Sequence, residues 1–110
     1  MTDKLVVFTT FGSEEDAARV VAALLEERLI ACGTVLPRVR SMYRWQNRVQ
    51  DQSEALALLK SDTRCWPQLE RRLLELHPYQ TPECLALPVR AGAAKYLAWM
   101  EAELQPPSGA

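Results

Sequence analysis

The feature that most constrains the fold is a pair of long strand-like arms around one short turn. In the first arm, 32–45, polar and apolar residues alternate from residue 38 onward, which is the period of a half-buried strand. The second arm, 49–60, ends in a densely apolar run. Asn47 lies in the intervening turn, 46–48, where its tolerance of positive φ is useful. The pattern predicts a hairpin whose arms are much longer than the usual strand of about 5–6 residues.

This hairpin also predicts contact with another chain. Its apolar end belongs in a core, whereas the arginine-rich tip around 38–50 projects beyond it. A long projecting hairpin leaves backbone N–H and C=O groups unpaired along its edges, and proteins cover such edges. Pro37 has no N–H to donate, so it marks a bulge or an edge in the first arm. We therefore expect a second copy of the chain to pair with the hairpin.

Helices are predicted on either side of the hairpin. Ser13 is a natural N-cap with acidic residues after it, so we expect a helix over 14–30. The second helix starts near Pro67 and ends at His77, because Pro78 forces His77 out of helical geometry. A short last helix is expected over 93–104. The predicted apolar faces are Ala18, Val21, Ala22, Leu25 and Leu29 in the first helix, Trp66, Leu69, Leu73 and Leu76 in the second, and Tyr96, Trp99 and Met100 in the third.

Two further strands complete the pattern. Residues 4–11 are β-branched and aromatic, and residues 84–89 form a short apolar run in which Pro88 favours an edge position. The resulting order, β-α-β-β-α-β followed by an extra C-terminal helix, is the α+β ferredoxin-like arrangement. We expect one domain over 1–104 and a flexible tail over 105–110. This architecture hosts many functions, so it does not by itself identify one.

Composition excludes several classes of function. The net charge is −1, the isoelectric point is near 5.8 and the strand over 54–58 has no aromatic residue, so nucleic-acid binding is not expected. No apolar run reaches the roughly 20 residues of a membrane span. The N-terminus does not resemble a signal peptide. Three widely spaced cysteines predict no disulfide framework and favour the cytoplasm.

The residues capable of chemistry are few. His77 is the only histidine, and it opens the sequence His-Pro-Tyr-Gln-Thr-Pro-Glu, 77–83, which predicts a rigid turn into the last strand. No serine or cysteine lies at a spacing that places it beside His77, so we do not expect an enzyme. Without Cys-x-x-Cys or His-x-x-x-His, a closed four-ligand metal site within one subunit is not expected. A site of two or three ligands, or one shared between subunits, stays open.

Four segments together resemble the CutA family, whose members are described as divalent-cation tolerance proteins. They occur in the family's order and spacing and cover nearly the whole chain outside the tail. The resemblance implies a compact homotrimer, similar in build to PII signalling proteins, in which the long hairpin pairs with the neighbouring subunit. The matching segments are RLIACGTVLPRVRSMYRW (28–45), SEALALLKS (53–61), HPYQTPECLALPV (77–89) and YLAW (96–99).

The resemblance also implies where a metal binds. The family is associated with a Cys-Cys-His copper set, of which Cys32 and His77 are the matching residues here. The remaining cysteine position is occupied by Thr9, which is a poor copper ligand. From the resemblance we predict a cytoplasmic homotrimer that takes part in divalent metal tolerance. It is expected to bind copper or another divalent cation weakly and partly between subunits.

A second set of predicted site residues faces an intersubunit cleft in the implied trimer, namely Arg44, Trp45, Tyr79 and Glu83. The alternative is a PII-like signalling trimer that binds a small anionic metabolite or nucleotide there and acts through a partner protein. Acidic groups in the cleft favour a cation. Convergent arginines favour an anion, and the candidates for that role are Arg38, Arg40, Arg44 and Arg48.

Overall fold

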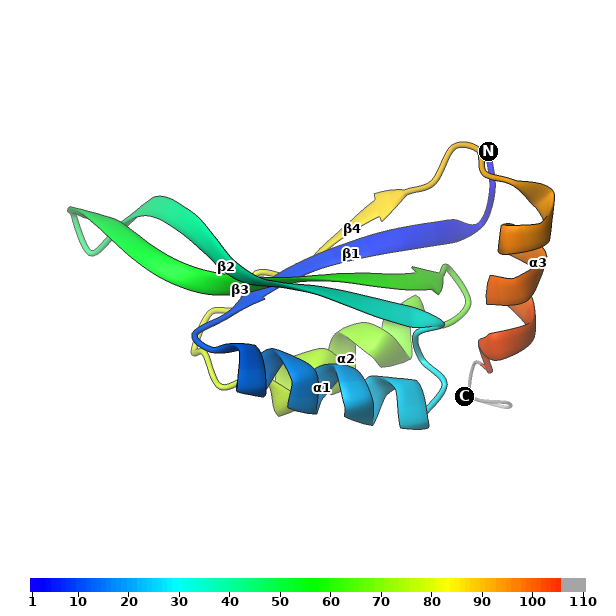
Figure 1. Cartoon of the computed structure of the whole chain (residues 1–110), viewed down its shortest axis with the longest axis horizontal. Helices are drawn as coiled ribbons and strands as arrows, with labels where there is room; N and C mark the ends of the chain where they lie inside the picture. The colour runs from blue at the N-terminus through cyan, green and yellow to red at the C-terminus, as the bar shows by residue number, and fades with distance from the viewer. Residues whose placement is uncertain (106–110) are drawn as a thin grey trace.

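The structure is a computed structural model that describes residues 1–105 (Figure 1). These residues form the predicted β-α-β-β-α-β order and the extra C-terminal helix. The predicted domain, 1–104, lies within this range, whereas the predicted tail lies, after residue 105, outside the described residues. The elements are β1 (Lys4–Phe11), α1 (Glu14–Glu26), β2 (Cys32–Trp45), β3 (Arg48–Asp62), α2 (Trp66–Leu76), β4 (Leu85–Pro88) and α3 (Ala94–Glu103).

The strands form one antiparallel sheet in the order β2-β3-β1-β4, which confirms the ferredoxin-like prediction. The β2–β3 hairpin extends well beyond the helices along the longest dimension of the subunit, 43 Å (Figure 1). Gln46 and Asn47 form its two-residue turn, with φ values of 50° and 63°. Positive φ at both positions matches the twist of the flanking strands. Strand β3 therefore starts at Arg48, one residue earlier than predicted.

Both predictions drawn from prolines in strands are confirmed. The β2–β3 register shifts between Leu36 and Val39, where Pro37 lies, and β2 is an edge strand. Strand β4, which ends at Pro88, forms the other edge. Proline fits these positions because it has no N–H to donate to a neighbouring strand. The sheet therefore presents two open edges.

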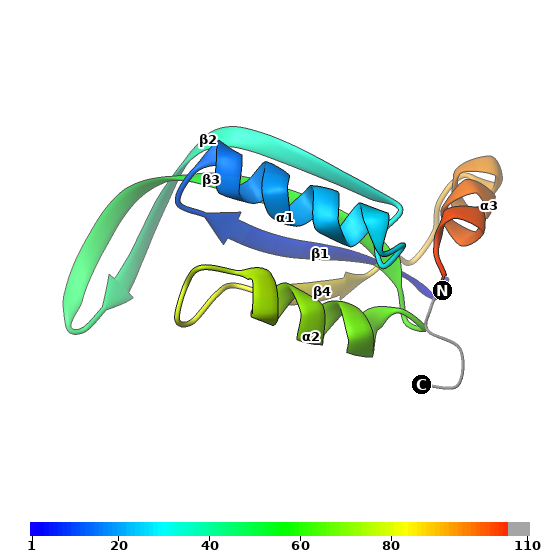
Figure 2. The same ribbon diagram turned by 90° about the horizontal axis from the view of Figure 1, so that it is seen from below.

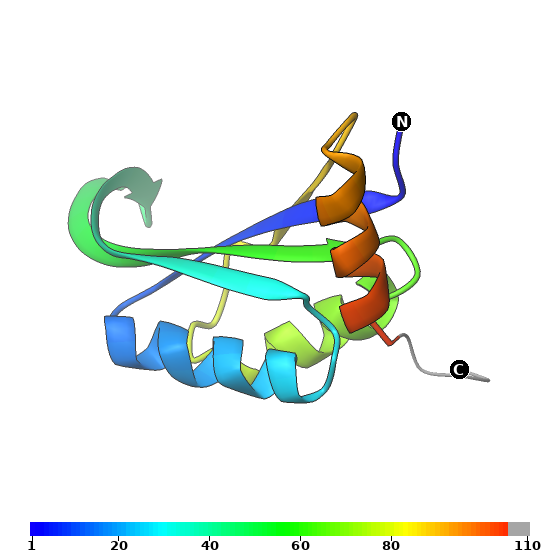
Figure 3. The same cartoon turned by 45° about the vertical axis from the view of Figure 1, so that its right-hand side comes forward.

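Helices α1 and α2 cover one face of the sheet (Figures 2 and 3). Leu69 and Leu73 of α2 are fully buried in the core between the helices and the sheet. Trp66 and Leu76 are partly buried against this core, as predicted. Gly33 of β2 permits the close approach of α1, because a Cβ there would lie 2.5 Å from a Val21 methyl. The core comprises Val7, Phe11, Ala17, Val20, Val21, Leu24, Leu29, Ile30, Ala55, Ala57, Leu59, Leu69 and Leu73.

The predicted apolar face of the first helix was right for Val21 and Leu29 and wrong for its other three residues. The buried face is Ala17, Val20, Val21 and Leu24, whereas Ala18 and Ala22 are exposed and Leu25 is 41% exposed. Glu15, Arg19 and Glu26 lie on the opposite side of the helix, so helical spacing does indicate the buried face, and the prediction followed Ala18 and Ala22 instead. The helix also ends at Glu26 rather than near residue 30.

The early end of α1 has a clear cause in its C-terminal cap. Arg28 adopts φ 58°, its N–H bonds the Leu25 carbonyl, and the Leu29 N–H bonds the Leu24 carbonyl. These two bonds form a Schellman motif, which reverses the chain direction at a helix end. The reversal returns Leu29 and Ile30 to the core, where both are almost fully buried.

The other face of the sheet carries apolar side chains and no helical layer. Alternation along β1 and β3 directs Ala57 and Leu59 to the helices and Leu56 and Leu58 to this open face. At its edges Leu36, Leu85 and Leu87 are 39%, 58% and 44% exposed. We call this surface the open face and define it by Val6, Phe8, Leu36, Leu56, Leu58, Leu85 and Leu87.

Helix α3 packs against the end of the sheet (Figure 3). Met100 is buried in a small second cluster with Ala31, Cys65 and Leu104. Tyr96 and Trp99, predicted for the same apolar side, are 42% and 43% exposed. Their rings contact each other, with centroids 5.4 Å apart. The prediction for α3 was therefore right for Met100 and wrong for the two aromatic residues.

Candidate functional site

His77 has a structural environment that leaves neither ring nitrogen free. Its side chain is only 7% exposed and stacks on Phe11, with ring centroids 4.3 Å apart. Nε2 lies 2.8 Å from the Thr10 carbonyl oxygen, and Nδ1 accepts from the Tyr79 backbone N–H at 3.1 Å. Since a carbonyl only accepts and an N–H only donates, the ring is neutral and protonated at Nε2. Burial lowers its pKa below the usual 6.5, which also favours this neutral form.

Within one subunit the structure does not bring the implied copper ligands together. Cys32 pairs with Lys60 on β3, whereas Thr10, which contacts His77, pairs with Leu56 through β1. Four residues along a strand correspond to about 13 Å. The Cys32 Sγ instead lies 3.9 Å from the Lys60 Nζ. Thr9 is fully buried on the helix-covered face and adds no ligand from that side.

The residues predicted to face an intersubunit cleft do come together, because three of the four line one hollow. This hollow, about 700 Å³ in volume, lies between the outer hairpin and the turn over 79–83. Figure 3 shows the tip of the β2–β3 hairpin curling away from the helical layer. By strand register Thr10 and Glu54, which line the hollow, are on the same face as Leu56, the face that α1 and α2 do not cover. Trp45, Tyr79 and Glu83 line it, and Arg44 does not. We call it the cleft; its other lining residues are Thr10, Ser41, Met42, Tyr43, Gln52, Glu54, Gln80 and Thr81.

Glu54 is the cleft residue that the sequence analysis missed. Its side chain is 7% exposed, and its Oε2 accepts from the Tyr79 hydroxyl at 2.7 Å. Burial together with the Glu54 carboxylate raises the pKa of Tyr79, so the phenol stays protonated and keeps donating. A charged residue within the apolar run 54–59 was the available signal. His77 orients this pair, because it holds the Tyr79 backbone N–H.

The cleft is acidic and contains no basic side chain. Glu54 and Glu83 line it, and no lysine or arginine does. Neither carboxylate forms an ion pair within residues 1–105. Arg40, a candidate anion ligand, is engaged by Asp51 through two hydrogen bonds of 2.9 and 2.6 Å. The alternative of an anion-binding signalling trimer is therefore not supported.

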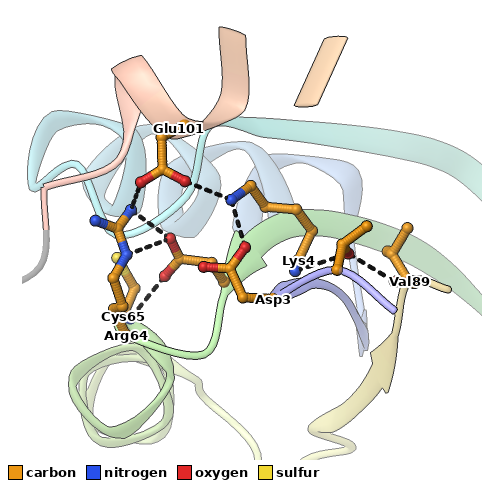
Figure 4. Close-up of polar contacts among 8 residues, drawn as sticks. Asp3, Lys4, Arg64, Cys65, Val89 and Glu101 are labelled. Carbon is orange, nitrogen blue, oxygen red and sulfur yellow. Dashed lines mark hydrogen bonds and ion pairs between the residues drawn. The ribbon is translucent and has the colours of Figure 1, made fainter. Parts of the chain in front are cut away.

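A second group of carboxylates lies at the other end of the sheet, beside α3 (Figure 4). Ligand atoms of Asp3, Asp62 and Glu101 lie within 4.8 Å of one another. Lys4 Nζ contacts Asp3 at 2.6 Å and Glu101 at 2.7 Å, and Arg64 Nη2 contacts Asp62 and Glu101 at 2.6 Å each. We call these five residues the paired cluster, because each of its carboxylates already contacts Lys4 or Arg64.

Comparison with known proteins identifies the family. The family model described as "CutA1 divalent ion tolerance protein" matches residues 5–103. The chain belongs to this CutA1 family. The divalent-cation tolerance protein CutA of Thermus thermophilus is 45% identical over 95 residues, covering 86% of this chain and 92% of the relative. That of Pectobacterium atrosepticum is 43% identical over 105 residues, covering 96% of each chain.

Solved CutA structures share the fold. The structure from Thermus thermophilus matches with a TM-score of 0.89 at 42% identity, covering 93% of this chain and 99% of the other. That of CutA from Xylella fastidiosa matches with a TM-score of 0.91 at 35% identity, covering 94% and 100%. One neighbour, from Archaeoglobus fulgidus, is described as periplasmic; at 24% identity it shows the fold alone. Within residues 1–105 of this CutA1 member, no helix is both long and apolar enough to span a membrane.

Proposed function

We propose that this CutA1 family member is a homotrimer that supports tolerance to divalent cations and binds such cations weakly at the cleft. The observation that carries the proposal is the cleft's charge, since two carboxylates line it without any basic partner. Carboxylate oxygens suit divalent cations. Within residues 1–105, the paired cluster is the single place where three candidate ligand atoms converge. The cleft alone therefore supplies an incomplete site, which agrees with weak binding completed by water or a neighbouring subunit.

Self-association is supported by the open face and the two sheet edges. The open face gathers seven apolar residues that α1 and α2 do not cover. Both β2 and β4 have one unpaired side. Closed rotational symmetry buries such faces and edges without leaving free ones for further growth. A trimer places the three open faces around one axis, with each long hairpin reaching the next subunit.

Cys32 favours copper among the divalent cations that the protein could bind. Its thiol lies on the same side of the sheet as the open face, at the start of an edge strand, and thiolates are good copper ligands. In the trimer we propose that this thiol contributes to copper binding from a neighbouring subunit. His77 takes part by holding Tyr79 rather than through a free nitrogen.

The test is native mass spectrometry of the purified protein during a Cu²⁺ titration. We expect a trimer near three times 12.4 kDa that takes up copper. Glu83→Gln and Cys32→Ser should each lower uptake, whereas Glu75→Gln, which removes an exposed carboxylate outside the cleft, should not. A monomer would contradict the assembly. Equal uptake by all three variants would contradict the cleft as the site.

We also propose a non-catalytic role in the cytoplasm. Burial raises the pKa of the Cys65 thiol to about 12 and raises that of Cys84, so neither is a ready nucleophile. The three cysteines are free within the described chain, as expected in a reducing compartment. Expression as a fluorescent fusion and cell fractionation would test the location.

A further inference from the structure

We propose that the natural ligand of the cleft is a small organic cation, carrying an amine or quaternary ammonium group. The aromatic rings of Tyr43 and Trp45 would face the cationic group, and Glu54 and Glu83 would balance its charge. This inference deepens the proposed function, because it rests on the same cleft being open to cations. It differs in assigning the cleft to a molecule rather than to a bare ion.

The cleft has the size of a small-molecule pocket. The cleft has a volume of about 700 Å³. Pockets for small molecules span roughly 300–1,000 Å³, whereas a divalent metal is enclosed by oxygen atoms about 2.0–2.6 Å away. Glu54 and Glu83 alone cannot close around an ion in so large a space. A ligand with several non-hydrogen atoms can enter this space and contact more than one of its lining groups at once.

Aromatic rings line the cleft. Tyr43 and Trp45 alternate on the same face of β2, so both rings border the cleft from the hairpin side. Each is 43% exposed, and Tyr79 opposite them is 36% exposed, which leaves ring surface available to a ligand. Aromatic faces attract ammonium groups through their quadrupoles, and tryptophan does so most strongly. A bare metal ion bound by carboxylates gains nothing from such a lining.

The charge in the cleft has a fixed position. The Tyr79 hydroxyl fixes the Glu54 carboxylate at 2.7 Å, so this buried charge has a defined position before any ligand arrives. Glu83 is exposed on the turn side. With no lysine or arginine in the lining, a ligand must bring the positive charge itself. An anion is repelled, and a neutral molecule leaves both carboxylates without a partner.

The test compares choline with 3,3-dimethylbutan-1-ol, which has the same shape without the charge. Binding is followed by NMR of the three tryptophan indole N–H signals in the intact protein. We expect choline to shift the Trp45 signal and leave Trp66 and Trp99 unchanged, with the neutral alcohol binding at least tenfold more weakly. In Trp45→Leu, which lacks this reporter, choline binding is measured by isothermal titration calorimetry and should be about fivefold or more weaker than in the wild type. Trp99→Leu is the matched control, because Trp99 is also 43% exposed but lies outside the cleft.

A Cu²⁺ titration of the same variants separates this inference from the proposed function. Trp45→Leu should weaken choline binding more than copper uptake, whereas Glu83→Gln should weaken both. Equal binding of choline and the alcohol, or no shift of Trp45 at tens of millimolar choline, would overturn the inference even if copper binds. Choline binding at Trp45 without any copper uptake would support it and contradict the proposed metal site.

Discussion

The paired cluster and the acidic residues of the cleft lie at opposite ends of the β1–β3 pair and have different roles. At one end, where Lys4 of β1 lies opposite Asp62 of β3 in the sheet, the paired cluster holds three carboxylates together with Lys4 and Arg64. At the other end Glu54 and Glu83 line the cleft with no basic side chain. The paired cluster thus has more carboxylates than the cleft but is the poorer candidate for a cation-binding site. What marks a cation site is an unpaired charge rather than the number of carboxylates.

The paired cluster fastens α3 to the ends of two strands. Glu101 of α3 contacts both Lys4 of β1 and Arg64, which follows β3 (Figure 4). Asp62 is fully buried and also accepts from the Cys65 backbone N–H at 2.9 Å, at the start of α2. In the cleft, by contrast, the Glu54 carboxylate is held by a single hydrogen bond from the Tyr79 hydroxyl and borders a hollow. We therefore expect mutations in the cluster to affect stability and mutations in the cleft to affect binding.

The largest effect is expected from Asp62→Ala. The substitution removes the acceptor for Arg64 and for the buried Cys65 N–H, at a cost of about 2–3 kcal/mol in the free energy of unfolding. Urea denaturation at fixed protein concentration measures it. The matched control is Asp51→Ala, which breaks the exposed pair with Arg40 and should change stability little. An equal loss in both variants would show that the cluster is no more than a surface ion pair.

His77 variants test the cleft end. His77→Ala loses the stack on Phe11 and both hydrogen bonds, and we expect a destabilisation of about 2 kcal/mol. His77→Asn keeps a side-chain acceptor for the Tyr79 backbone N–H, because asparagine accepts from the N–H two residues later in Asx turns. Choline and Cu²⁺ affinities should therefore recover in the Asn variant relative to Ala. If His77 is instead a direct copper ligand, Asn and Ala will lose copper equally while choline binding persists in the Asn variant.

Tyr79→Phe separates position from chemistry within the cleft. The ring remains, but Glu54 loses its hydroxyl donor, so stability should fall by about 1 kcal/mol. Thermal unfolding measures the change, with Tyr96→Phe as the control because Tyr96 lies in α3, outside the cleft. A Tyr79→Phe protein as stable as the wild type would show that the contact does not fix the Glu54 carboxylate.

The smallest effect is expected from pH, and it distinguishes the two ends. The folded state lowers the pKa of His77 through burial, so its contribution is complete above 6.5 and is lost as pH falls through the lower folded value. At the cluster, the hydrogen bond from Lys4 lowers the pKa of Asp3, whose contribution is complete above 3.8 and is lost only below it. Melting temperatures between pH 7 and pH 3 should show two separate declines. His77→Asn should remove the upper one and Asp3→Asn the lower one; a single decline unchanged by either variant would contradict both assignments.

Much of the fold was predictable because the responsible signals are local. Asn47 in the turn, Pro37 at the bulge and Pro88 at the edge each follow from the backbone chemistry of one residue. The face of α1 was misassigned although the sequence carries the signal, because the consecutive apolar residues 20–25 offer alternatives and the positions of Glu15, Arg19 and Glu26 decide between them.

The site was predictable only in part, for a different reason. Trp45, Tyr79 and Glu83 were assigned to one cleft through a family resemblance and do line one hollow. Glu54 was missed because it meets Tyr79 only in the folded chain, 25 residues away in sequence. The role of His77 depends on the carbonyl of Thr10, 67 residues away, which no local pattern reveals. Residue type therefore indicated what these groups can do, and tertiary contacts decided which of them remain free.

The most direct test of the account uses Mn²⁺ as a paramagnetic divalent probe, read through the tryptophan indole signals of the intact protein. Trp45 lines the cleft, and Trp99 lies on α3 two residues from Glu101 of the paired cluster. We expect Mn²⁺ to broaden the Trp45 signal first and Glu83→Gln to weaken this effect. Earlier broadening of Trp99, or broadening of Trp45 that is undiminished in Glu83→Gln, would contradict the claim that unpaired carboxylates direct cations to the cleft.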